Sequence, residues 1–158
     1  MNNPAAGSPA SVVICALADR RYAIPVADLV EISALVRITP LPAAPPAVLG
    51  VINRHGRVIP LLDLRQCLGM TGAVLGLETL FVVVRGGPEQ PDAAAGLVVD
   101  SVERVATLPP GAITLPAQSG PYIQGMAATQ GDSPLLVLDV PALLDAFSPS
   151  VLSLERTA

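Results

Sequence analysis

Short runs of apolar residues alternate along the chain with turn-forming residues, and this pattern predicts a protein built mainly from β-strands. The runs are four to seven residues long, which suits strands and is too short for core helices. Branched aliphatic residues, which favour strands, are common in them. We expect strands at 12–17, 22–26, 48–52, 57–62, 80–84, 95–99, 102–108, 122–128 and 135–138.

Turn residues between the runs predict how neighbouring strands connect. The first two runs flank charged residues at 19–21 and are expected to form a hairpin. A second hairpin is expected around 53–56, with a four-residue loop in which Gly56 can take a positive φ. The proline-rich stretch 40–46 predicts an extended connector, and 71–77 and 86–94 predict loops.

Helix signals are few and short. Asp63 can cap a helix that runs to Leu68, where Gly69 supplies a stop. Asp139 can cap a second helix, with Pro141 in its first turn and apolar residues following. Two short helices among nine strands keep the predicted fold class mainly β.

The two halves of the chain show the same order of features, which predicts an internal duplication. The segment 22–32 and the segment 95–105 place apolar residues at matching positions. About 75 residues also separate Gly50 from Gly125 and Asp63 from Asp139. We therefore expect two similar small β units. Each would be marginally stable in isolation, so packing together would stabilise both.

Composition limits the possible partners. Of the 158 residues 51% are hydrophobic and only 14% are charged, and the net charge is −4. Lys and Arg form no cluster, so binding to nucleic acid is not expected. The first ten residues lack the features of a signal peptide, and no apolar run is long enough to span a membrane. These features favour a cytoplasmic location without membrane insertion.

No constellation of catalytic or metal-binding residues is evident. His55 is the single histidine, and Cys15 and Cys67 stand apart in apolar surroundings, so we expect two reduced, buried thiols and no metal site. There is no phosphate-binding loop with a Lys-Ser/Thr ending and no nucleophile elbow. The sequence therefore predicts neither an enzyme nor a cofactor.

Several motifs, taken in order, resemble the signature of the CheW-like domain family. They lie at 31–32, 50–53, 56, 58–60, 62–64, 96–102, 122–125 and 138–139, with the proline-rich connector after the first. The resemblance covers roughly 11–147. It implies two five-stranded, SH3-like β-barrels packed side by side, each with a short helix. The expected division is about 20–75 for one barrel and about 10–19 plus 78–147 for the other. A flexible tail would precede them at 1–10, and a tail or short helix would follow at 148–158.

The same resemblance implies a scaffold without catalysis. Members of the family couple the cytoplasmic hairpin tip of a chemoreceptor to the regulatory domain of a CheA-type histidine kinase. In the family the receptor tip docks in an apolar groove between the barrels, and barrel ends contact the kinase. The expected partners are therefore a chemoreceptor tip and a CheA-type kinase, although the motifs identify no kinase-contact residues.

The receptor-binding residues implied by the resemblance come from both halves. Leu29, Glu31 and Ile32 match the segment on the receptor side, and Val99 and Asp100 match the second side of the groove.

The turn 53–56 matches an Asn-Leu-Arg-Gly turn of the family, but here it reads Asn-Arg-His-Gly. The family arginine, expected to pair with the glutamate matched by Glu31, is replaced by His55, and Arg54 stands at the usually apolar position. Histidine is mostly neutral at pH 7, so its pairing with Glu31 would be weaker. Arg54 could reach Glu31 only if the turn is rebuilt.

The sequence also allows a second hypothesis, in which the chain is a small-molecule-binding or sensory β-barrel. That function needs a cavity with converging polar groups. The low aromatic and polar content argues against it, whereas sparse surface charge fits an adaptor whose apolar patches are covered by partners.

Overall fold

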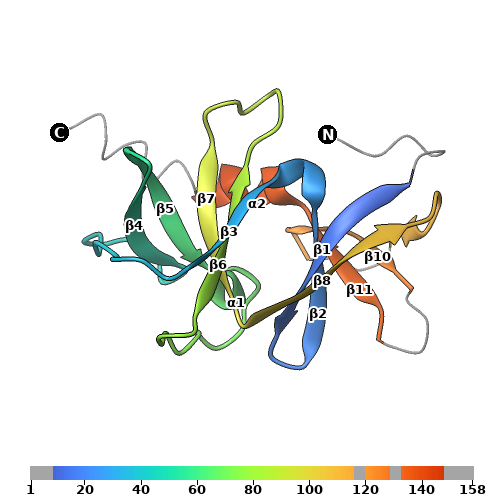
Figure 1. The fold of residues 1–158 in the computed structure, drawn as a ribbon, viewed down its shortest axis with the longest axis horizontal. Coiled ribbons are helices and arrows are strands. Elements are labelled where there is room, and N and C mark those ends of the chain that lie inside the picture. The colour runs from blue at the N-terminus through green and yellow to red at the C-terminus, as the bar shows by residue number, and fades with distance from the viewer. Residues whose placement is uncertain (1–8, 116–119, 129–132, 148–158) are drawn as a thin grey trace.

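The computed structural model describes residues 9–115, 120–128 and 133–147, which form two β-sheets and three short helices (Figure 1). The six-stranded sheet contains β1 (Ala10–Leu17), β2 (Arg20–Pro25), β8 (Ser101–Leu108), β9 (Ile113–Thr114), β10 (Ile123–Ala127) and β11 (Leu135–Leu138). The five-stranded sheet contains β3 (Leu29–Ala34), β4 (Val48–Arg54), β5 (Arg57–Asp63), β6 (Leu80–Arg85) and β7 (Ala94–Val99). The helices are η1 (Val26–Asp28, a 3-10 helix), α1 (Leu64–Cys67) and α2 (Val140–Phe147).

The prediction of a mainly β fold with two barrel-like units side by side is confirmed (Figure 1). The strand orders are β8-β1-β2-β11-β10-β9 and β3-β6-β7-β5-β4. The first sheet has six strands instead of the predicted five because the two-residue β9 pairs with β10. In the second sheet, Thr39 after the edge strand β3 forms a bridge to Val51 in the opposite edge strand β4. The sheet thus curls toward closure.

The strands are divided between the units differently from the predicted ranges. One sheet is built from residues 29–99, and the other combines 10–25 with 101–138. β2 stays with β1 because the short turn at Ala18 and Asp19 holds the two strands in one antiparallel pair. β6 and β7 belong to the five-stranded sheet because β6 pairs with β3 and β7 pairs with β5. β1 begins at Ala10, while 1–8 and 148–158, where tails were predicted, lie outside the described residues.

The predicted duplication appears as matched strand pairings. β5 pairs in parallel with β7, and β11 pairs in parallel with β2. The N–H of Asp63 donates to the carbonyl of Ala47, and the N–H of Asp139 donates to the carbonyl of Tyr122, both at 2.8 Å. Each of these aspartates precedes one of the two α-helices. The chain therefore builds the same strand-strand-helix arrangement twice.

Three apolar clusters hold the molecule together. One lies within each unit, around Ile14 and Leu135 in the six-stranded sheet and around Ile52 and Phe81 in the five-stranded sheet. The largest joins side chains of both sheets to α2, which lies between them in Figure 1. Since the largest cluster is shared, neither unit can separate without exposing apolar surface to water.

Candidate functional site

A charged cluster joins the two edge strands of the five-stranded sheet. Glu31 lies on β3 and Arg54 on β4, and Arg54 Nε donates a hydrogen bond to Glu31 Oε1. The Nε2 atom of His55 lies 3.8 Å from Glu31 Oε2. Hydrogen bonding to Arg54 holds the pKa of the Glu31 carboxyl below its usual value and raises that of Arg54. Arginine, with its permanent charge, is thus the main partner of Glu31.

The turn beside this cluster differs from the predicted four-residue loop. β4 continues to Arg54, which is opposite Arg57 on β5, so only His55 and Gly56 form the turn. Both have positive φ, 52° and 82°, as a type I′ hairpin requires. Asn53 Oδ1 accepts a hydrogen bond from the N–H of Gly56. This tight turn is the rebuilding that lets Arg54 reach Glu31, while the His55 side chain is 76% exposed.

Apolar residues cover the outward face of β3 and its continuation. Residues 30, 32, 34 and 36 are exposed, whereas Glu31 and Ser33 between them are partly buried. We call the exposed set, Val30, Ile32, Ala34 and Val36, the β3 stripe. Ile32 is 41% exposed although it is a branched aliphatic residue on an edge strand. An apolar row on an edge strand is typical of a surface that another protein covers.

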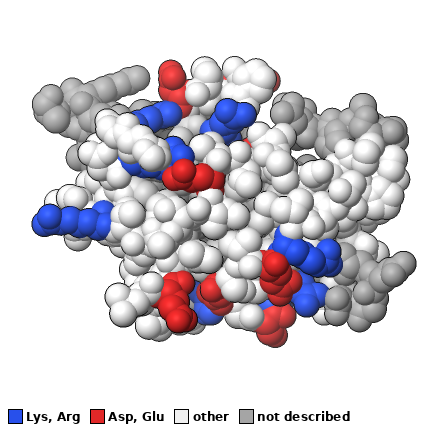
Figure 2. Space-filling model, in the orientation of Figure 1, with Lys and Arg blue, Asp and Glu red and all other residues white. Residues whose placement is uncertain are grey.

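The duplication places a related apolar residue on the other sheet. Val105 on β8 matches Ile32 on β3 in the two halves and is 65% exposed. Charge is sparse on this protein's surface, and Figure 2 shows one face on which charged side chains gather toward the upper and lower margins. The area between them carries few charges. Surfaces of this composition suit protein contacts better than contacts with polyanions.

The two predicted residues from the second half lie away from Glu31. The side chain of Asp100 pairs with Arg65 of α1 through two hydrogen bonds and accepts a third from the N–H of Ala18 at 2.7 Å. Hydrogen bonding to Arg65 is the main cause that lowers the pKa of Asp100. Asp100 thereby ties the β1–β2 turn to α1 at the point where the chain crosses between the sheets.

The predicted site residues therefore form two groups. Arg54 and His55 both lie against Glu31, which precedes Ile32 on β3, while Val99 and Asp100 lie at the end of β7. Val99 is only 2% exposed, so its side chain packs in the shared core and offers no surface to a partner. Leu29 is partly buried and packs against the same core. The sequence analysis did not identify Val30, Val36 or Arg65, although the alternation of 30–36 was visible.

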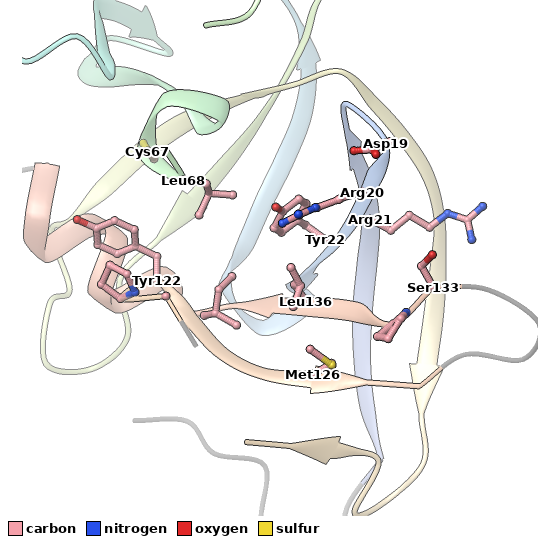
Figure 3. Close-up of a pocket in the computed structure, with 14 residues that line it drawn as sticks. Asp19, Arg20, Arg21, Tyr22, Cys67, Leu68, Tyr122, Met126, Ser133 and Leu136 are labelled. Carbon is pink, nitrogen blue, oxygen red and sulfur yellow. The ribbon is translucent and has the colours of Figure 1, made fainter. Parts of the chain in front are cut away.

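A surface pocket of about 600 Å³ lies next to α1 and bears on the small-molecule alternative. Figure 3 shows Tyr22, Leu136 and Met126 along it, with Asp19 of the β1–β2 turn at its upper side and Arg20 of β2 beside Tyr22. Its size falls within the range of small-molecule sites, and its lining mixes charged side chains of the β1–β2 hairpin with apolar ones.

The cysteines, the possible metal ligands and the length of the helices bear on other functions. Both cysteines are free and buried, and burial raises the pKa of each thiol to about 12. No three His, Cys, Asp or Glu side chains within 9–115, 120–128 and 133–147 gather as a group that could hold a metal ion. Among the same residues, no helix is long and apolar enough to cross a membrane.

Comparison with known proteins decides the family. A sequence model of the CheW-like domain matches residues 11–148, which is most of the chain. The chain belongs to the CheW-like family. The fold is similar to the crystal structure of the scaffolding protein TtCheW from Thermoanaerobacter tengcongensis, with a TM-score of 0.75 and 26% identity. That similarity covers 86% of this chain and 92% of the other.

Individual relatives share part or most of the chain. The chemotaxis protein CheW of Helicobacter pylori is 36% identical over 84 residues, 53% of this chain and 48% of that protein, so the match spans about half of the relative. CheW of Klebsiella aerogenes is 28% identical over 142 residues, 85% of this chain and 81% of that protein. Protein FrzA of Myxococcus xanthus is 34% identical over 103 residues, 65% of this chain and 61% of that protein.

Proposed function

We propose that this protein is a non-enzymatic adaptor that couples chemoreceptor-type proteins to a CheA-type histidine kinase in a bacterial signalling array. The observation that carries the proposal is the CheW-like domain across 11–148, together with a solved scaffold of the same fold. The relatives named chemotaxis protein CheW support a role in chemotaxis or motility signalling. The proposed place of action is the cytoplasm, where the receptor tip and the kinase of such arrays lie.

The proposed receptor-binding surface is the β3 stripe with the adjoining Glu31–Arg54 pair. Ile32 would contribute apolar area to a receptor hairpin, since an exposed branched side chain is the kind of group that a partner buries. Glu31 and Arg54 would fix the orientation of the docked helix, because a paired arginine presents donors in a rigid geometry. His55 stands at the rim of this surface and is available to a partner.

The other predicted receptor-binding residues would act indirectly. Leu29 and Val99 pack behind the surface in the shared core, where they would hold β3 and β7 in place. Asp100 would position the junction of the two sheets through its bonds to Arg65 and to the backbone of Ala18. We therefore propose that the receptor is contacted by Glu31, Ile32, Arg54 and His55. Leu29, Val99 and Asp100 would hold these residues in position.

The kinase half of the proposal is tested by titration calorimetry. Full-length protein is titrated with the isolated regulatory domain of the CheA-type kinase encoded in the same genome. We expect saturable binding in the micromolar range, about −8 kcal/mol. Ile32→Asp should bind the kinase domain as the wild type does, since the β3 stripe is proposed to face the receptor. Absence of binding to every such kinase domain of that genome would refute the adaptor function.

A further inference from the structure

A second pocket, of about 440 Å³, lies between η1, α2 and the loop that joins β6 to β7. Its polar lining consists of four carboxylates and two side-chain amides, from Asp28, Glu89, Asp139, Asp145, Gln90 and Gln124. No Lys or Arg is among the described residues that line it. The pocket therefore presents hydrogen-bond acceptors and negative charge to whatever enters it.

Asp28 is the unusual member of this set. It is only 8% exposed, and its carboxylate has neither a hydrogen bond nor an ion pair with any described residue. Burial and the charge of Asp139 raise its pKa, and the opposite charge of Arg85 offsets this only in part. Its carboxylate oxygens are nevertheless open to the pocket, because among the described residues the fully enclosed side-chain atom without a partner is Gln90 Oε1. Partial desolvation still disfavours the charged form, in line with the raised pKa. A cation bound in the pocket would neutralise the charge of Asp28 and offset the cost of its burial.

The amides of the pocket point to the same kind of occupant. Gln90 Nε2 donates to Asp145 Oδ1 at 3.4 Å, and Gln124 Nε2 donates to the carbonyl of Leu138 at 3.0 Å. One of the two N–H donors of each amide is thus used within the protein. In contrast, Gln90 Oε1 is buried without a hydrogen-bond partner. The enclosed atom without a partner is an acceptor, and carboxylate oxygens outnumber the amides in the lining, so a ligand that donates hydrogen bonds suits the pocket best.

The other half of the duplication shows what completes a site of this type. There, Asp63 accepts hydrogen bonds from Arg65 N, Gln66 Nε2 and Ala73 N, and Asp100 is paired with the Arg65 side chain. The position that matches Arg65 in the second half is Pro141, which cannot supply a cation. One half therefore carries its own guanidinium beside the helix, and the other half lacks it.

We propose that this acidic pocket, at Asp28, Gln90, Gln124, Asp139 and Asp145, binds the guanidinium group of an arginine side chain on a partner protein. A guanidinium carries five donors in one plane and can satisfy several acceptors at once. The acceptors are spread around the pocket and, among the described residues, are not gathered as metal ligands. The occupant would take the role that Arg65 fills in the first half.

This inference goes beyond the proposed adaptor function and does not depend on it. The pocket contains no residue of the β3 stripe, although Asp28 directly precedes β3, so the pocket would form an additional contact point beside the start of that strand. The partner is defined here by chemistry alone, as a protein that presents an exposed arginine to the face carrying α2. The test uses a small probe, and its result is independent of whether the kinase or the receptor binds.

The test is a titration of the 15N-labelled full chain with N-acetyl-L-arginine amide, followed by the side-chain amide signals of Gln90 and Gln124. We expect saturable shifts at both, with a dissociation constant in the millimolar range for so small a ligand. Asp28→Asn should weaken binding about tenfold or more, since it removes a charged acceptor. Asp19→Asn, which removes the same charge from the exposed β1–β2 turn, should leave binding unchanged.

Matched ligands separate the outcomes. N-acetyl-L-citrulline amide has nearly the same shape without the charge and should give no saturable shift. Equal shifts with the citrulline compound, or shifts that persist in folded Asp28→Asn, would overturn the proposal. Free L-arginine should bind no tighter than the blocked probe. If it bound more than tenfold tighter, the site would recognise a free amino acid, and the assignment to a partner's side chain would be wrong.

Discussion

The two helix-capping aspartates test whether matching residues of the two duplicated halves contribute differently to stability. Asp63 and Asp139 occupy matching positions, and each donates its backbone N–H to a carbonyl 2.8 Å away. Their side chains differ. Asp63 is 1% exposed and accepts three hydrogen bonds, whereas Asp139 accepts one, from Ala142 N at 3.1 Å, among the described residues.

These contacts predict different costs for the same substitution. Asp63→Ala removes a helix cap, which costs ~1 kcal/mol. It also leaves the N–H of Ala73 without its acceptor, which costs ~1–3 kcal/mol. The Gln66 amide is partly exposed and can turn to water, so it adds little. We expect a total loss of ~2–4 kcal/mol in the free energy of unfolding. Asp139→Ala should lose only the cap, ~1 kcal/mol.

Equilibrium unfolding in urea measures this difference. The chain has no tryptophan, so far-ultraviolet circular dichroism is the suitable signal. Both variants should keep the wild-type slope with denaturant, and Asp63→Ala should have the lower midpoint. Equal losses in the two variants, within ~0.5 kcal/mol, would show that the additional bonds of Asp63 contribute nothing. The inference that Asp63 stabilises its half of the duplication more than Asp139 stabilises the other would then be wrong.

Three further predictions concern packing and titration. Gly125→Ala should destabilise the fold by ~2 kcal/mol and lower the thermal midpoint, because a Cβ there would lie 2.5 Å from Cγ2 of Ile113; an unchanged midpoint would contradict this. Asp28→Asn should raise stability at neutral pH, because the folded-state pKa of Asp28 is raised above its ordinary 3.8. The gain should shrink as pH falls through that raised pKa and vanish below the ordinary value, where both states bind the proton. Unfolding of both proteins measured against pH tests this, and a gain that persists in acid would contradict it. Cys15 and Cys67, with pKa values raised to about 12, should react with a thiol reagent at pH 8 only as the protein unfolds, so rapid labelling of the native protein would refute the buried assignment.

Strands, helix caps and the family could be predicted from the sequence because each depends on local chemistry. The turn at Gly56, the cap at Asp63 and the stop at Gly69, which has a φ of 81°, follow from residue types that adopt few conformations. β9 was missed because a two-residue strand leaves no periodic pattern. The division of strands between the sheets was wrong because it depends on long-range pairing, such as β5 with β7, which local sequence does not encode.

The geometry of the proposed site could be predicted only in part, for a related reason. The alternation at 30–36 indicates that one face is apolar, but it does not say whether that face points to the core or to solvent. The structure places Ile32 outside, and it places Val99 inside the shared core. The Glu31–Arg54 contact depended on whether the turn has four residues or two, since one residue of difference changes which side chain faces Glu31. Family resemblance pointed to Glu31 and to the turn 53–56, and the geometry shows that Arg54 is the main partner of Glu31.

The most direct test of the central claim is a reconstitution of coupling. Receptor fragments containing the hairpin tip are assembled with the CheA-type kinase of the same genome, and kinase autophosphorylation is measured with and without this protein. We expect activity to rise when the protein is added. Ile32→Asp should abolish the rise while its affinity for the kinase domain stays at the wild-type value, and Val58→Asp, on an exposed side chain outside the β3 stripe, should retain it. Kinase activity that is the same with and without the wild-type protein would contradict the account.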